Sequence, residues 1–209
     1  MITLFIDTST DTLTVSIIND DVILDEITLP SSEHSKYAMS AIESIFDKNN
    51  IKRNSVNKIM VVNGPGSFTG IRIGVTIAKI YAWACNINVV PISTLKAYAI
   101  SNMGCKYYIS SIDARRNYVY AAIYDSNYNN ILDESYINKD DLINKIIKLE
   151  DYLIISNTPI SEFNTVKPKL DIKRIYDYYK NDIGINCHAL KPVYLKEVEA
   201  VEKMGGYND

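Results

Sequence analysis

The amino-acid sequence predicts an α/β protein built from two similar lobes, each with a mixed sheet flanked by helices. Three strand-like segments near the amino terminus are followed by a helix pattern and another strand. The same order of three strands, a helix and a strand returns after residue 105. The chain has 209 residues, which is long enough for two small lobes with cores of their own.

The first lobe is expected over residues 1–104. Its first strand is an apolar run, its second alternates, and its third follows an Asn-Asp-Asp turn. A Pro-Ser-Ser-Glu sequence then predicts the start of a helix, with Ser31 or Ser32 as its cap. In chain order, the elements are expected at Ile2–Asp7, Thr12–Ile18, Val22–Leu29, His34–Lys48, Lys58–Val62, Arg72–Ala84, Val89–Ser93 and Thr94–Met103.

The second lobe is expected over residues 105–190 and is a shorter, looser version of the first. Residues 157–190 are weakly patterned, and only a helix near Lys173–Asn181 is expected there. The C-terminal segment, residues 191–209, is expected to return to the first lobe. The other elements are expected at Tyr107–Asp113, Tyr118–Tyr124, Ile131–Ile137, Lys139–Leu149 and Tyr152–Ser156. This duplication is the outline of the actin/Hsp70/sugar-kinase (ASKHA) architecture.

Composition excludes several classes of function. The formal net charge is −3 and neither half of the chain is basic, whereas autonomous nucleic-acid binding needs a clustered positive face. Three widely spaced cysteines predict neither a disulfide scaffold nor a zinc site, and they suit a reducing cytosol. The chain shows no signal-peptide start and no apolar run of membrane-spanning length. We therefore expect a cytoplasmic protein without a resident metal or cofactor.

A glycine-rich turn separates the fourth strand from the second helix. Glycine tolerates conformations that a side chain forbids, so Gly66 and Gly70 are expected to adopt backbone conformations that a Cβ penalises. Such a turn can hold an anion at a helix N-terminus, but the Lys of a Walker loop is missing. We expect it to shape the start of the helix more than to bind phosphate. The turn comprises Gly64, Pro65, Gly66, Ser67, Thr69 and Gly70.

Each lobe carries an acidic residue where its first strand ends, the position at which actin-like ATPases hold Mg²⁺ and phosphate. In the first lobe, Asp7 is followed by Thr8 and Ser9 but by no Gly or Lys. In the second, Asp113 is followed by Ala-Arg-Arg, and the two arginines crowd a phosphate cradle. The Gly-Gly-x-x-Ala adenosine motif is also missing. We interpret the pair as a degenerate nucleotide site, with an actin-fold small-molecule kinase or ATPase using Asp7 as the alternative.

The second helix is apolar nearly all round, so it is expected to be buried on more than one side. Either it is covered by its own sheet and a neighbouring helix, or it forms a subunit interface. We assign its small residues outward, because close approach of another helix requires them, and its isoleucines to the sheet. The small-residue face is Gly74, Ala78 and Ala82, the isoleucine face is Ile73, Ile77 and Ile80, and the expected partner contacts are Tyr37, Ala41, Ile45, Arg72, Gly74, Ala78, Lys79, Ala82 and Trp83.

Four segments resemble the bacterial TsaB (YeaZ) family, which takes part in making threonylcarbamoyladenosine beside the tRNA anticodon. They are Asp7-Thr-Ser, Asn63–Gly74, Asp113-Ala-Arg-Arg-x-x-Val-Tyr120 and Pro192-Val-Tyr-Leu-Lys196. The glycine-rich segment is the most specific of the four, and together they span the chain. Residues 125–185 depart from the family pattern.

The resemblance implies an actin-like two-lobed fold and a role as a non-catalytic scaffold. Family members lack the metal-binding His-x-x-x-His of the catalytic subunit TsaD, and here Ala38 stands four residues after His34. The implied partners are TsaD, bound through helices of the first lobe, and the ATPase TsaE. The resemblance also implies a homodimer when the protein is alone, contact with tRNA only through the complex, and no membrane association.

Overall fold

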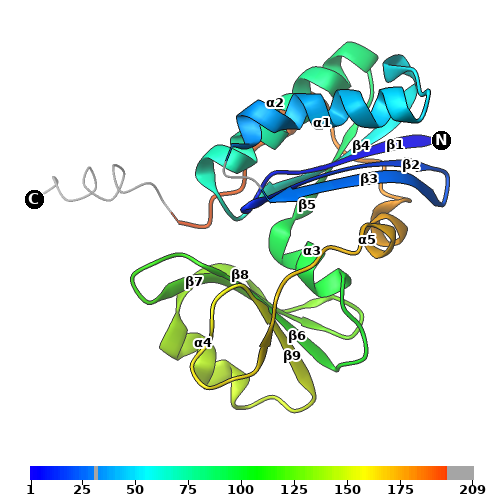
Figure 1. The fold of residues 1–209 in the computed structure, drawn as a ribbon. Coiled ribbons are helices and arrows are strands. Elements are labelled where there is room, and N and C mark those ends of the chain that lie inside the picture. The colour runs from blue at the N-terminus through cyan, green and yellow to red at the C-terminus, as the bar shows by residue number, and fades with distance from the viewer. Residues whose placement is uncertain (31–32, 197–209) are drawn as a thin grey trace, which may run out of the picture.

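The computed structural model describes residues 1–30 and 33–196, and in this part of the chain it contains two five-stranded sheets, one in each lobe. The strand orders are β3-β2-β1-β4-β5 and β10-β9-β6-β7-β8. In the first sheet, β1 pairs with β2 and β2 with β3 in antiparallel fashion, whereas β4 is parallel to both β1 and β5. The second sheet repeats this pattern, with antiparallel pairs β6–β7 and β7–β8 and a parallel pair β6–β9. The two-lobed fold with mixed sheets and flanking helices, expected from the sequence, is therefore confirmed (Figure 1).

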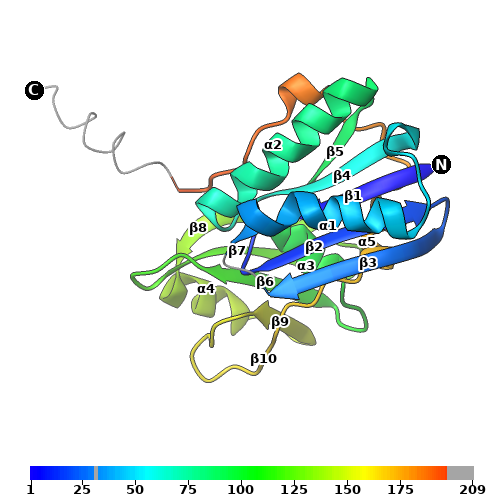
Figure 2. The ribbon, with the colours of Figure 1, turned by 45° about the horizontal axis from the view of Figure 1, so that its top comes forward.

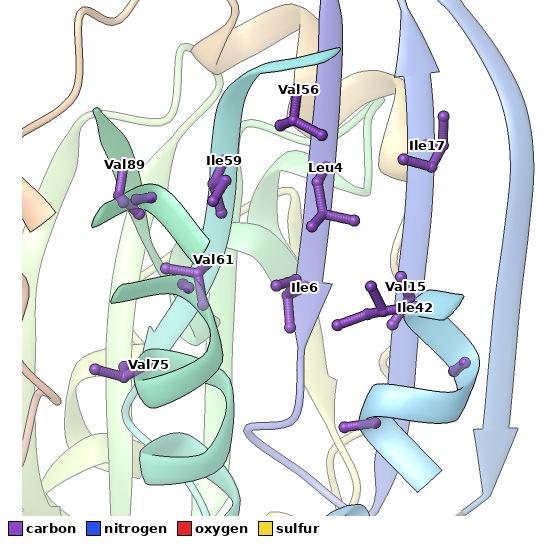
Figure 3. Close-up of a cluster of buried hydrophobic side chains, with 14 of the residues drawn as sticks. Leu4, Ile6, Val15, Ile17, Ile42, Val56, Ile59, Val61, Val75 and Val89 are labelled. Atoms are coloured by element: carbon purple, nitrogen blue, oxygen red, sulfur yellow. The ribbon is translucent and has the colours of Figure 1, made fainter. Parts of the chain in front are cut away.

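The first sheet is covered by helices on both faces (Figure 1). Leu4 and Ile6 of β1 point to the side covered by α1 and α2, and Phe5 between them points to the side covered by α3 and α5. Figure 3 shows the first of these two cores. The elements of this lobe are β1 (Ile2–Asp7), β2 (Thr12–Asn19), β3 (Val22–Pro30), α1 (His34–Lys48), η1 (Arg53–Ser55), β4 (Val56–Gly64), α2 (Phe68–Cys85), β5 (Val89–Ser93) and α3 (Thr94–Ile100).

The second sheet packs on α4 with one face and on α3 with the other. Helix α3 therefore lies between the two sheets, where Tyr98 and Leu95 join a buried cluster with Tyr108 and Tyr124. The elements of this region are β6 (Tyr107–Asp113), β7 (Tyr118–Asp125), β8 (Asn130–Asn138), α4 (Lys139–Ile146), β9 (Tyr152–Ser156), β10 (Thr165–Val166), α5 (Ile172–Tyr179) and η2 (Cys187–Ala189).

The chain returns to the first lobe well before residue 190. Ile172, Ile175 and Tyr176 of α5 are buried in the core beneath the first sheet. Further along, Ile185 pairs with Val89 through two backbone hydrogen bonds of 2.8 and 2.9 Å. The boundary expected at residue 190 is thus placed too late, because helical periodicity identifies α5 without indicating which sheet it covers.

The expected orientation of α2 is wrong. Its small-residue face points into the molecule, and Ala78 and Ala82 are fully buried in the core of the first lobe. A Cβ on Gly74 would lie 2.5 Å from Thr8 Oγ1, so these small residues let the helix approach the hairpin and sheet closely. Ile80, expected to cover the sheet, is 61% exposed. The expected partner contacts that are instead buried in the chain's own core are Ala41, Ile45, Gly74, Ala78 and Ala82.

Two local features complete the fold. The predicted cap residues Ser31 and Ser32 lie outside the described residues, and α1 begins after Glu33. Helix α2 starts four residues earlier than expected, at Phe68, because the Ser67 side chain caps it by accepting a hydrogen bond of 3.2 Å from the Gly70 N–H. Among the described residues, no helix is both long and apolar enough to cross a membrane.

Candidate functional site

The glycine-rich turn docks the start of α2 directly onto the turn between β1 and β2. The Ser67 N–H donates a 2.7 Å hydrogen bond to the Ser9 carbonyl, and the Thr8 hydroxyl donates one of 2.7 Å to the Gly70 carbonyl. A Cβ on Gly66 would lie 2.1 Å from the Ser9 carbonyl oxygen, and a Cβ on Gly70 would lie 2.1 Å from that of Thr8. Both glycines are therefore required by close backbone approach.

A backbone conformation that a Cβ penalises was expected at both glycines, and the structure shows one only at Gly66. Gly66 has a φ of +158°, at the edge of the region that favours glycine. Gly70 lies within α2 and is not among the residues of positive φ, so its expected backbone penalty is wrong. At Gly70 a side chain is excluded by Thr8 rather than by its own backbone. The peptide bond between Gly64 and Pro65 is cis.

Asp7 closes the β1–β2 turn from inside the protein. Its side chain is only 3% exposed, and one carboxylate oxygen accepts a 2.8 Å hydrogen bond from the Ser9 N–H. Burial, the largest influence on this group, raises the pKa of Asp7 above its ordinary value. The geometry is that of an Asx turn closing a hairpin.

His34 is bound to the same turn, with Nε2 2.5 Å from the Thr10 carbonyl oxygen. The described residues contain no cluster of three or more His, Cys, Asp or Glu side chains arranged to hold a metal ion. His34 therefore joins α1 to the β1–β2 turn.

Two hollows open between the lobes at this turn. The first, of about 350 Å³, includes Asp7 and Tyr98 in its wall, and the second, of about 450 Å³, includes Gly66 and Asp113. Asp113 is itself paired with Lys139, with 3.3 Å between carboxylate oxygen and Nζ. The structure thus places Asp7 and Asp113 in the walls of two neighbouring interlobe hollows, and each is held by other groups of the protein.

The outer side of α1 and α2 carries exposed apolar side chains, which we call the α1–α2 face. Figure 2 shows the two helices next to each other on this side of the molecule. Ile80 is 61% exposed and Trp83 is 67% exposed, which is unusual for such large side chains. The face consists of the exposed Met39, Phe68, Ile80 and Trp83 together with the half-buried Ile73 and Ile77.

Two adjoining hollows run along this face between the helices. They have volumes of about 400 and 480 Å³, and both are lined by Met39 and Ile77. Of the expected partner contacts, Arg72 lines one of these hollows, and Trp83 is exposed next to Ile80 on the side of η2. Tyr37 is exposed on α1 but lines neither hollow, and Lys79 lies half-buried beside η2. Sequence reasoning missed Met39 and Phe68. The exposed helical stripe to which Phe68 belongs could have been found only if the helix start had been placed correctly.

Residues 191–196, the described part of the C-terminal segment, reach one end of the α1–α2 face, and the rest of that segment lies outside the described residues. The Arg72 guanidinium carbon lies 4.0 Å from the centre of the Phe68 ring, and Arg72 Nε donates a 3.0 Å hydrogen bond to the Tyr194 hydroxyl. The rings of Phe68 and Tyr194 are 5.1 Å apart. Residues from the glycine-rich segment and from the Pro-Val-Tyr-Leu-Lys segment, distant in sequence, therefore form one aromatic and cationic cluster.

Comparisons with known proteins give a consistent result. The model of the family described as TsaD, tRNA N6-adenosine threonylcarbamoyltransferase, matches residues 26–179. The chain is 40% identical over 126 residues to the tRNA threonylcarbamoyladenosine biosynthesis protein TsaB of Bacillus subtilis, an alignment that covers 59% of this chain and 55% of that protein. The Escherichia coli protein of the same name is 31% identical over 131 residues, covering 61% of this chain and 57% of that protein. The chain thus spans little more than half the length of these relatives.

A solved structure shows the same fold. YeaZ from Pseudomonas aeruginosa superimposes with a TM-score of 0.75 at 19% sequence identity, over 92% of this chain and the whole of that chain. At this level of identity the likeness concerns the fold. It extends over both lobes, including the segment after residue 125 in which the sequence departs most from the family pattern.

Proposed function

This chain belongs to the TsaB (YeaZ) family, and on that premise we propose that it is a non-catalytic partner subunit in the threonylcarbamoylation of tRNA. In this role it binds and supports the catalytic subunit TsaD, and the pair recruits the ATPase TsaE. Contact with tRNA is made through the complex, because the net charge of −3 gives this chain no general attraction for nucleic acid. The complex works in the cytoplasm.

The observation that carries the proposal is the α1–α2 face. Exposed aromatic and branched aliphatic residues around a groove are typical of a protein–protein interface, and Trp is the residue most often found at its energetic centre. Ile77 lines both hollows of the groove and Ile80 lines one of them, while Trp83 lines a further hollow with Ile80 on the side of η2. We assign this face to TsaD in the complex and to a second copy when the protein is alone.

The sequence relationship between this chain and the proposed partner supports this assignment. The family model that matches the chain describes the transferase itself, so the two proteins are related over the region that contains α1 and α2. Related subunits can pair through corresponding surfaces about an approximate two-fold axis, in the way that identical subunits pair about an exact one. The same two helices, α1 and α2, could then bind either a second copy of this chain or TsaD.

The β1–β2 turn supports a non-catalytic role. A phosphate cradle needs free backbone N–H groups facing the anion, and here the glycine-rich turn packs against the β1–β2 turn, with the Ser67 N–H bound to the Ser9 carbonyl. The alternative is a small-molecule kinase or ATPase that uses Asp7. The observation in its favour is that Asp7 lines a hollow of about 350 Å³.

Binding of purified TsaD tests the proposal. We expect Ile80→Glu to weaken binding at least tenfold, because it places a charge where apolar surface is covered. The matched control is Ile147→Glu, since Ile147 is 62% exposed on the second lobe and lies outside the α1–α2 face. Equal TsaD affinity for both variants and the parent would refute the assignment of the face. ATP turnover by the pure protein that Asp7→Ala abolishes would favour the kinase alternative.

A further inference from the structure

The turn between β7 and β8 reaches from the second lobe to the first, which it contacts through Tyr128. The Tyr128 hydroxyl donates a 2.8 Å hydrogen bond to the Asn102 carbonyl and accepts one of 2.5 Å from Arg174 Nη2. The Tyr128 carbonyl accepts a hydrogen bond from the Lys96 ammonium group. One residue of the second lobe therefore binds α3, the segment after α3, and α5.

Arg174 completes the connection on the side of the first lobe. Its Nε donates a 2.7 Å hydrogen bond to the Ile100 carbonyl, and Nη2 lies 3.3 Å from the Asn102 carbonyl oxygen. The guanidinium thus holds the end of α3 and the Tyr128 hydroxyl at once. Because its donors form a rigid planar fork, Arg174 fixes the direction as well as the distance of these contacts.

Tyr128 has a backbone conformation that a tyrosine rarely adopts, with a φ of +62°. The left-handed conformation is unfavourable for a residue other than glycine and persists only where the surrounding structure holds it. The turn is held by Asp125, whose carboxylate accepts hydrogen bonds of 2.8 Å from the N–H groups of Asn127 and Asn129. The tyrosine ring lies between the two lobes, with its centre 5.5 Å from that of Tyr108 in β6 and 5.9 Å from that of Tyr178 in α5.

The interlobe cleft carries opposite charges on its two walls. Asp11 and Glu26 come from the first lobe, and Lys167 and Lys169 come from the segment that follows β10. None of these four side chains forms an ion pair with another described residue. Attraction between the walls favours closure of the cleft, yet the structure keeps it open.

We propose that Tyr128, with Lys96 and Arg174, forms an interlobe latch that holds the cleft open. None of the three lines either interlobe hollow, so they act on the angle between the lobes and not on the cleft itself. Closure would have to move the β7–β8 turn relative to α3 and α5, and these contacts resist that movement. With the latch formed, the two lobes behave as one rigid body. An enzyme that closes on its substrate would need the opposite behaviour.

The distance between the walls tests the latch directly. Spin labels on p-acetylphenylalanine at Leu29 and Val166, both exposed, report this distance by pulsed electron resonance and leave the three cysteines in place. We expect Tyr128→Gly to shorten the mean distance and broaden its distribution, since glycine keeps the turn but removes the side-chain contacts. We expect 1 M salt to reverse the shortening, because it screens the attraction between the walls.

Two further variants make the result unambiguous. Tyr128→Phe removes only the hydroxyl, and we expect a smaller shift in the same direction even if Tyr128→Gly does not fold. Tyr178→Phe is the matched control, because Tyr178 contributes its ring and no hydrogen bond to the cluster, and we expect the distribution of the parent. An unchanged or longer distance in folded Tyr128 variants would overturn the latch. This measurement uses no partner, so its outcome is independent of whether TsaD binds the α1–α2 face.

Discussion

Trp83 offers a quantitative test of the α1–α2 face. A Trp side chain buries about 200 Å² when fully covered, and Trp83 is 67% exposed in the free chain. A partner that covers it would therefore remove roughly 130 Å² of mainly apolar surface from water, worth about 3 kcal/mol at ~25 cal/mol per Å². We expect Trp83→Ala to weaken TsaD binding by about 100-fold, with ~1.4 kcal/mol for each factor of ten.

The assay is a titration of labelled TsaD with each variant, read by fluorescence anisotropy. Trp83 makes few contacts within its own chain, so the circular dichroism spectrum and thermal midpoint of Trp83→Ala should match those of the parent. Ile147→Ala is the control for loss of exposed apolar area, since Ile147 is 62% exposed on the other lobe. If Trp83→Ala binds TsaD within twofold of the parent, the face that we assign does not carry the interface.

Three further predictions concern stability. Gly70→Ala should lower the free energy of unfolding by several kcal/mol in denaturant titrations, because the new Cβ would lie 2.1 Å from the Thr8 carbonyl oxygen. A Gly→Ala change within a helix usually stabilises, so equal or greater stability of the variant would refute the close approach. Ala78→Glu should unfold the first lobe, since Ala78 is fully buried, whereas Ile80→Glu should leave a folded chain by circular dichroism, and the reverse would restore the orientation of α2 expected from the sequence. Burial raises the pKa of Asp7, so the stability that its protonated carboxyl contributes is present at low pH and is lost as the pH rises through the raised pKa. Asp7→Asn should therefore raise the thermal midpoint at pH 7 but have little effect below about pH 4. A lower midpoint for Asp7→Asn at pH 7 would contradict this.

Sequence periodicity predicted the elements of this fold well because most of them have one clear buried face. The helix His34–Lys48 and the strands Ile2–Asp7 and Tyr107–Asp113 have the bounds that the sequence predicted. The arrangement of the later segments was less predictable. Residues 157–190 contain few periodic apolar residues, and α5 covers the first sheet after the chain has crossed back from the second lobe.

The orientation of α2 could not be derived from its own residues. A helix that is apolar nearly all round has no polar stripe to indicate its exposed side. The deciding contact lies far away in sequence, where Thr8 approaches the helix so closely that Gly70 and Gly74 must lack side chains. The small residues therefore mark the inner side of α2, and the large side chains of Ile80 and Trp83 are left exposed on the α1–α2 face.

The acidic ends of the first strands were predictable, but their surroundings were not. Asp7 and Asp113 were expected at strand ends and lie at the interlobe cleft. No pattern in the sequence indicates that the start of α2 packs against the β1–β2 turn, because that contact joins residues about 60 positions apart. The same holds for Tyr128, whose role depends on Lys96 and Arg174 from distant elements.

The most direct test of the proposed function is the threonylcarbamoyladenosine content of tRNA in cells depleted of this protein, measured by mass spectrometry of hydrolysed tRNA. We predict that depletion removes the modified nucleoside and that the parent chain restores it. We predict that Asp7→Asn also restores it, because the role is non-catalytic, whereas Trp83→Ala restores less. Normal levels of the nucleoside after depletion, or failure of a folded Asp7→Asn variant to restore them, would contradict the role of this chain as a non-catalytic partner of TsaD.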